Sequence, residues 1–280
     1  MKKAVYLLIA VCLCCPLLTA SGAELESPAG SADLSIDNED DAYRFAEAFF
    51  TSPYVDGLSD GCTMTITHAE NSWQAVLAPA DTSLPTLTLR FAASGRIQQY
   101  QNSDYVLPTL DGFSIEEDIS FEEINNVDTL RVLLPHMENN TCAVYAREGN
   151  VAYYNVDTFY VWLGLAMGEP TPELVAYCDL ETDGARYPGY LSRAEAEEAA
   201  KLALAETYGS AAEQADHYKP IQADFVLQEG LWPYPDMPLP YWFLVLGDEA
   251  GGLERQYEVL IDAATGEILE INDSAAIGNG

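Results

Sequence analysis

The chain has 280 residues, and its 45 acidic side chains outnumber its 12 basic ones, so its formal charge at pH 7 is −33. A surface of this sign repels phosphate backbones and anionic lipid headgroups, which argues against a nucleic-acid partner and against a polybasic membrane-docking role. The charge is compatible with basic partners or divalent cations; the alternative interpretation is that it only keeps the protein soluble. With 49% hydrophobic residues, the chain is long enough for two or three small domains.

Residues 1–23 have the pattern of a secretory signal peptide. Lys2 and Lys3 precede an apolar run from Ala4 to Ala20, and small residues stand at the cleavage position, Ser21-Gly22-Ala23. Cysteines lie inside the run, but none follows the small residue that lipid anchoring requires, so a lipoprotein is the lesser alternative. No later run approaches the ~20 apolar residues that span a bilayer. We therefore expect a secreted or extracytoplasmic protein with no membrane span in the mature chain.

Three cysteines lie beyond the signal segment, at Cys62, Cys142 and Cys178. None belongs to a CxxC pair, and the tight spacing of zinc ligands is missing. An oxidising compartment permits one disulfide and leaves one thiol over. The sequence does not determine which two of the three would pair.

Residues 24–36 are rich in small residues and read as a flexible leader. A helix is expected next in the section 37–109, with Asp37 as its cap, an acidic first turn, and apolar residues at helical spacing as far as Phe50. Strand-like runs follow at 64–66, 73–77 and 86–91, and a further run begins at Ile97. This section therefore predicts one helix followed by a meander of strands.

The middle section, residues 110–190, contains a capping box at Ser120 and Glu123, which predicts a short helix. Strand-like runs follow at 142–146, 151–156, 159–167 and 174–178. The next segment, DLETDG, places Asp179, Glu181, Asp183 and Gly184 as in the first half of a calcium loop. Its twelfth position would be Tyr190, which cannot supply the bidentate carboxylate, so the preferred interpretation is a plain acidic turn.

The last section, residues 191–273, opens on a second capping box, Ser192 and Glu195, before an alanine-rich helix that ends near Tyr208. A strand is expected at 221–227. The proline-rich segment Leu231–Trp242 must be extended. We interpret it as a loop over its own sheet, with an exposed aromatic binding ridge as the alternative.

The stretch Tyr241–Asp273 carries the clearest strand pattern. Residues 241–246 form an unbroken aromatic and aliphatic run, which predicts a strand buried on both faces, and residues 257–261 alternate as a strand with one face on a core. Between that strand and the next, Asp262–Gly266 predicts a turn in which Gly266 takes positive φ. Residues 274–280 are expected to be a loose tail.

Two parts of the chain resemble each other, which indicates an internal repeat. Trp73-Gln-Ala-Val-Leu, Leu87-Thr-Leu-Arg-Phe and Ala-Ala-Ser-Gly95 correspond to Trp242-Phe-Leu-Val-Leu, Tyr257-Glu-Val-Leu-Ile and Ala-Ala-Thr-Gly266. A third segment, at residues 159–184, is more weakly similar to these two. We therefore predict an α+β fold of repeated modules, each with one helix packed on an antiparallel β-sheet.

The last copy, about 191–273, resembles the PepSY domain, a module of the propeptides of secreted metallopeptidases and of many secreted bacterial proteins. The resemblance rests on Ser192-Arg-Ala-Glu-Ala-Glu-Glu-Ala and on Tyr257-Glu-Val-Leu-Ile-Asp-Ala-Ala-Thr-Gly-Glu-Ile-Leu. A degenerate copy at 37–102 departs from the pattern, because Phe91-Ala92 stands where Ile261-Asp262 stands in the last copy. The resemblance implies a helix packed on an antiparallel sheet, in a module that binds or inhibits.

No catalytic constellation accompanies these modules. His68, His136 and His217 are scattered over the three sections, and neither an HExxH nor a GxSxG motif is present. We expect no catalytic residue, no cofactor and no metal site.

The predicted function is a secreted, non-enzymatic binding protein that regulates an extracytoplasmic peptidase or cell-envelope enzyme, with edge strands as the contact surface. An acidic cell-surface or cation-binding structural protein is the alternative, followed by an unrecognised hydrolase.

Overall fold

The computed structural model describes residues 35–55, 61–69, 71–110, 121–135, 137, 142–156, 160–168, 171–182, 184–208, 212–227, 237–248 and 255–273. The predicted signal peptide, most of the leader and the C-terminal tail lie outside these residues. So do Ser120, His136, Asp183 and residues 231–236 of the proline-rich segment.

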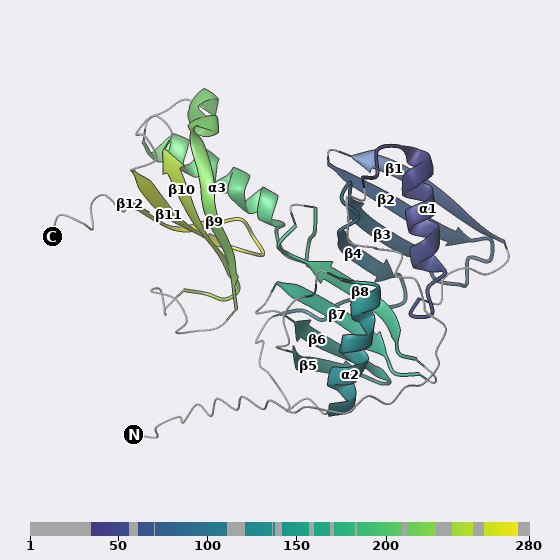
Figure 1. Ribbon diagram of the computed structural model, residues 1–280. Coiled ribbons are helices and arrows are strands. Elements are labelled where there is room, and N and C mark those ends of the chain that lie inside the picture. Colours follow the sequence, from purple (N-terminus) through teal and green to yellow (C-terminus); the bar gives the residue numbers. More distant parts are fainter. Residues whose placement is uncertain are drawn as a thin grey trace, which may run out of the picture.

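The described chain contains two antiparallel sheets (Figure 1). The larger sheet has the strand order β1-β2-β3-β4-β8-β7-β6-β5. Its strands are β1 (Cys62–Ala69), β2 (Ser72–Pro79), β3 (Leu87–Ala92), β4 (Ile97–Asn102), β5 (Cys142–Glu148), β6 (Val151–Val156), β7 (Val161–Ala166) and β8 (Glu173–Asp179). The smaller sheet has the order β12-β11-β10-β9, with β9 (Tyr218–Val226), β10 (Tyr241–Asp248), β11 (Gln256–Asp262) and β12 (Ile268–Asp273).

This arrangement corrects the predicted α+β fold of repeated helix-on-sheet modules, which is wrong. The described structure is mostly sheet, with 44% strand against 21% helix, and its three α-helices do not each cover a sheet of their own. The physical reason is that β4 pairs with β8 through Gln99↔Cys178, Tyr100↔Tyr177 and Gln101↔Ala176. These backbone hydrogen bonds join the strands of the first and middle sections into one continuous eight-stranded sheet.

Three α-helices accompany the sheets: α1 (Glu39–Phe50), α2 (Phe121–Thr129) and α3 (Arg193–Thr207). In Figure 1, α1 lies over β1–β4 and α2 over β5–β8, and both cover the same face of the larger sheet. The third helix packs on the smaller sheet. Short 3-10 helices occur at Leu130–Val132 and Ala212–His217.

The N-cap of α1 is Asn38 and not Asp37 as the sequence predicts. Asn38 has extended backbone dihedrals, and its side-chain oxygen accepts a hydrogen bond from the Asp41 N–H at 3.0 Å. Asp37 instead accepts a hydrogen bond from the Ser35 hydroxyl. Either residue type caps a helix well, so local sequence does not decide between neighbouring positions. The capping box of Ser192 and Glu195 at the start of α3 is confirmed.

Each face of the larger sheet contributes to a different core. On the helix-covered face, the apolar side of α1 packs with side chains from both halves of the sheet, including Phe91, Tyr100 and Tyr154. On the opposite face, the β5–β8 half packs with α3 and the smaller sheet in a second core. The β1–β4 half of that opposite face contributes no described residue to this second core, and the chain at Gly184 lies against it, because Arg90 Nη1 donates to Gly184 C=O.

A chain of aromatic rings connects the two sheets through the second core. Trp162 of β7 contacts Tyr187 at a centroid distance of 5.3 Å, and Tyr187 contacts Tyr190 at 5.8 Å. Tyr190 then contacts Phe225 of β9 at 6.0 Å, and Phe225 contacts Trp242 of β10 at 5.1 Å. Aromatic pairs of this kind add about 0.5–1.5 kcal/mol each to the burial of their surface, so the connection favours a fixed placement of the two sheets.

The predicted strands and turn of the closing stretch are confirmed. Both faces of β10 are buried, one in the second core and one in a small cluster that includes Tyr241 and Phe243. In the following turn, Asp262 Oδ1 accepts hydrogen bonds from the N–H groups of Ala264 and Thr265, and Gly266 has φ +77°. A side chain at this φ would be strained, which explains the glycine.

None of the helices within the described ranges has the length and the apolar composition that a membrane crossing requires.

The topology separates the three cysteines beyond the signal segment. Cys62 lies in β1 at one edge of the larger sheet, Cys142 lies in β5 at the other edge, and Cys178 lies in β8 between them. Adjacent strands are about 4.8 Å apart, so three strand steps separate Cys178 from Cys142 by at least about 14 Å. A disulfide needs Cα atoms within about 7 Å, so no two of these cysteines are close enough to pair within one chain.

We therefore predict that the protein contains no intramolecular disulfide among these three cysteines. Cys178 is fully buried, and burial raises the pKa of its thiol, so it should resist iodoacetamide in the native state and react after unfolding. Mass spectrometry of protein alkylated before and after denaturation, without reductant, measures both effects. A cross-linked peptide that joins two of the three would contradict the strand order.

Candidate functional site

The edge strand β1 is a candidate contact surface because it is the least protected edge of either sheet. Its eight residues pair with β2 in an unbroken register, and no described strand pairs with its other side. Thr63, Thr65 and Thr67 are exposed, whereas Met64 and Ile66 pack partly against the core beneath α1. A strand that pairs with β1 would therefore have threonines as neighbours on one face of the sheet and apolar side chains as neighbours on the other.

The other three edge strands carry features that oppose further pairing. Natural sheets protect their edges with charges, prolines and bulges. Strand β5 has Arg147, Glu148 and a register shift, β9 has Lys219, Pro220 and a register shift, and β12 has Glu270 and Asp273. Strand β1 has no lysine, arginine, acidic residue, proline or register shift. It is thus the only unprotected edge among the described strands.

The hydrogen-bond register shows which backbone groups β1 presents. The Ala80 N–H donates to the Gly61 C=O, so Gly61 and Ala80 form a hydrogen-bonded pair at the end of the β1–β2 ladder. In an antiparallel ladder such pairs alternate with pairs whose N–H and C=O groups point away. Met64, Ile66 and His68 therefore direct their backbone N–H and C=O groups to the open edge. We call these three residues the β1 edge.

The calcium-like segment DLETDG forms an arginine-centred ion cluster. Arg96, in the turn between β3 and β4, donates from Nε and Nη2 to Asp179 Oδ2 at 2.9 and 2.7 Å. Its Nη2 also donates to Glu181 at 2.7 Å. The Asp179 side chain is 0% exposed. Burial raises the pKa of the Asp179 carboxyl, and the guanidinium of Arg96 opposes that rise.

The same segment forms a turn, as the preferred interpretation of the sequence predicts. The backbone N–H of Glu181 donates to Asp179 Oδ1, and the N–H of Thr182 donates to Asp179 C=O. Two of the three acidic side chains that the sequence suggested as calcium ligands therefore bind an arginine. Within the described ranges, no three His, Cys, Asp or Glu side chains lie together as a metal site would require.

The described histidines and the proline-rich segment do not come together in one site. His68 lies in β1 with its ring 4.4 Å from that of Trp73, whereas His217 lies in the 3-10 helix that precedes β9 of the other sheet. Trp242, at the end of the proline-rich segment, is fully buried and donates its indole N–H to Leu191 C=O. This tryptophan is therefore a core residue and not part of an exposed aromatic ridge.

Sequence reasoning did not identify Arg96 and Arg90, two arginines that make long-range contacts. Arg90 Nη1, on β3, donates to Gly184 C=O at 2.7 Å across 94 positions of sequence. The sequence offers one signal for these two residues, which is the scarcity of basic side chains. The chain has only 12 basic residues and 45 acidic ones, so an arginine in a predicted strand or turn is notable.

No family model and no curated protein matches the chain. Among solved structures, an uncharacterized protein from Eubacterium rectale is 14% identical and aligns over 85% of this chain and 84% of its own, with a TM-score of 0.32. A similarity of this size carries no conclusion about fold or function.

We predict that Arg96→Met destabilises the protein by about 3–5 kcal/mol, because it leaves the buried Asp179 charge without its partner. Arg44→Met is the matched control: the Arg44 side chain is 77% exposed and lies 3.9 Å from Asp41, so its loss should cost less than about 1 kcal/mol. Urea denaturation measures both.

Adding Asp179→Asn to Arg96→Met should restore part of the stability, since it removes the unpaired charge and keeps an acceptor for the turn. Equal, small losses for Arg96→Met and Arg44→Met would show that the ion cluster does not stabilise the junction of β4 and β8.

Proposed function

We propose that this chain is a non-enzymatic binding protein that takes up an extended segment of a partner protein along the β1 edge. The observation that carries the proposal is the absence of protection on β1, in contrast to β5, β9 and β12. An added strand would hydrogen-bond to the outward backbone groups of Met64, Ile66 and His68. Its side chains would alternate between the threonine side of β1 and the apolar side beneath α1.

The charge of the chain supports a basic partner. The formal charge is −33, and α1, which contacts β1 and β2, carries exposed Glu39, Asp40 and Glu47. Pairing of β1 with β1 of a second copy would bring two such surfaces together, so charge repulsion disfavours self-association at this edge. A lysine- or arginine-rich segment meets the opposite field and gains in association rate and specificity.

The class of partner that we propose is a peptidase or other enzyme outside the cytoplasm. The resemblance of residues 191–273 to the PepSY domain supports this class, since that module occurs in the propeptides of secreted metallopeptidases. The signal-peptide pattern of residues 1–23 supports the compartment. In this proposal, binding at the β1 edge regulates the enzyme, and the chain carries out no reaction of its own.

The proposal predicts that a blocked nonapeptide of alternating lysine and valine binds the protein and that the matching glutamate–valine peptide does not. Affinity should fall with added salt, because the attraction is partly between exposed charges. Ile66→Pro removes an outward N–H without breaking the β1–β2 ladder, and it should weaken binding at least about tenfold. Isothermal titration calorimetry measures these affinities.

Val106→Pro is the control, because Val106 is exposed and lies outside the strands. Melting temperatures establish that both variants fold. Equal binding of the basic peptide by wild type and Ile66→Pro would refute the edge as the site. A second arm assays secreted metallopeptidases: if no enzyme is bound or slowed by wild type, the peptidase class of partner is wrong even where the edge binds peptide.

A further inference from the structure

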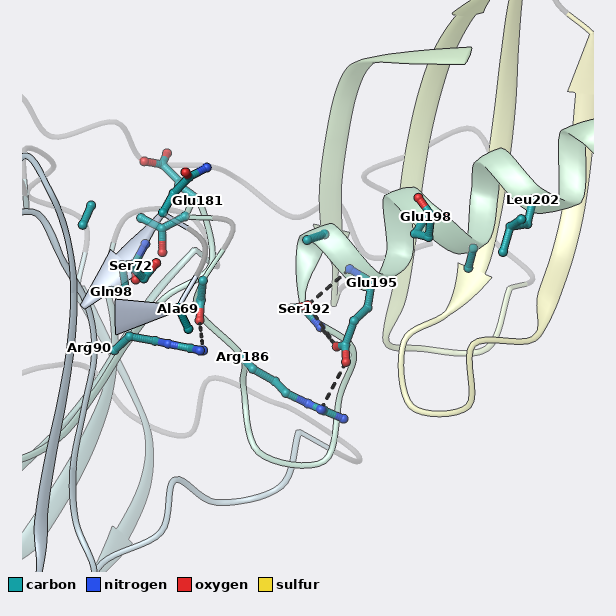
Figure 2. Close-up of a pocket in the computed structure, with 16 residues that line it drawn as sticks. Ala69, Ser72, Arg90, Gln98, Glu181, Arg186, Ser192, Glu195, Glu198 and Leu202 are labelled. Carbon is teal, nitrogen blue, oxygen red and sulfur yellow. Dashed lines mark hydrogen bonds and ion pairs between the residues drawn. The ribbon is translucent and has the colours of Figure 1, made fainter. Parts of the chain in front are cut away.

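A cleft of about 940 Å³ lies between α3 and the face of the β1–β4 half that is opposite α1. Figure 2 shows the two walls: Arg90, Gln98 and Ser72 belong to the larger sheet, and Ser192, Glu195 and Glu198 belong to the start of α3 and its cap. The volume is in the range of small-molecule and peptide sites. A second hollow of about 260 Å³ continues along the same sheet face, and Arg90 lines both.

Arg90 differs from most of the described cations of this acidic chain. Arg44, Arg96, Arg131, Arg186, Arg193, Lys201 and Arg255 each lie within 4.0 Å of a carboxylate. Within the described part of the chain, Arg90 lies near no carboxylate, and its contact is the hydrogen bond from Nη1 to Gly184 C=O. Its buried Nε has no acceptor there. A partly buried guanidinium without a carboxylate is a ready anion site, because its planar fork matches a carboxylate.

Gln98 places an amide beside this arginine. It lies at the register shift between β3 and β4, the residue is 5% exposed, and its Oε1 has no hydrogen-bond donor within the described ranges. An unsatisfied buried acceptor is unfavourable, so a ligand that supplies an N–H to it gains affinity. The neighbouring hollow is lined by Gln74, Gln99 and Gln101, whose amides both donate and accept.

The cleft also carries negative charge. Glu195 and Glu198 line it from α3, and Glu181 lines it from the turn after β8 on the sheet side (Figure 2). Arg186 donates to Glu195 at 3.3 Å, and Arg96 donates to Glu181. The backbone N–H of Ser192 donates to the Glu195 carboxylate, which lowers the pKa of that group, so it is ionised at neutral pH. The cleft therefore combines one guanidinium that has no carboxylate partner among the described residues, a buried amide oxygen without a donor there, and several carboxylates.

We propose that this cleft binds the C-terminal end of a short peptide. The terminal carboxylate bonds to Arg90, the last backbone N–H donates to Gln98 Oε1, and a cationic group further along the peptide lies near the carboxylates of the cleft. Because Arg90 Nε and Gln98 Oε1 are shielded from solvent in this structure, the proposal requires the ends of both side chains to turn toward the ligand on binding. A doubly charged phosphate is disfavoured, since the net charge of −33 repels it more strongly than it repels a singly charged carboxylate.

The test uses two peptides that differ only at the last group: Lys-Ala-Ala-Ala with a free carboxylate, and the same sequence with a C-terminal amide. Calorimetric titration of wild-type protein should show at least about tenfold tighter binding of the free carboxylate. Arg90→Gln should abolish that difference, whereas Arg44→Gln, which removes the same charge from an exposed helix position, should leave it unchanged.

Equal binding of the two peptides by wild type would overturn the proposal without reliance on any variant. Displacement of the peptide by inorganic phosphate at equal concentration would also overturn it, because it would indicate a general anion site. Melting temperatures establish that Arg90→Gln folds. Ile66→Pro should bind Lys-Ala-Ala-Ala as wild type does, so this result is independent of the outcome at the β1 edge.

Discussion

The ion pair between Arg96 and Asp179 stabilises the junction on which the architecture depends. It connects the turn after β3 to the end of β8, next to the place where β4 and β8 pair over three residue pairs. A junction this short contributes few backbone hydrogen bonds, so a buried ion pair at its end has a large share in fixing the register. Because removal of one partner leaves an uncompensated charge in the interior, the pair also disfavours alternative strand arrangements.

The position of both proposed sites follows from that junction. Once β4 pairs with β8, the larger sheet has only two edges, and β1 is the edge without charges, prolines or a bulge. The aromatic contacts from Trp162 to Trp242 then place the smaller sheet against the β5–β8 half alone. The other half keeps a polar face outside the second core, and α3 forms the opposite wall of the cleft in front of it.

The local features of this fold were predictable, and its long-range contacts were not. The capping box of Ser192 and Glu195 and the turn from Asp262 to Gly266 depend on residues within a few positions of each other, so the sequence contains the whole interaction. The pairing of Arg96 with Asp179 spans 83 positions. Nothing in DLETDG shows that an arginine in another section neutralises it, and the alternation of Gln99, Tyr100 and Gln101 does not show which strand lies beside β4. The predicted separate modules failed for this reason.

The most direct measurement for the β1 edge is amide hydrogen exchange, resolved by residue with NMR. In the free protein, the N–H groups of Met64, Ile66 and His68 should exchange faster than those of Thr65 and Thr67, which bond to β2. Addition of the lysine–valine peptide should slow exchange at the first three and leave the two threonines unchanged. Slow exchange at Met64, Ile66 and His68 in the free protein, or no change on addition of peptide, would contradict an open edge that accepts a strand.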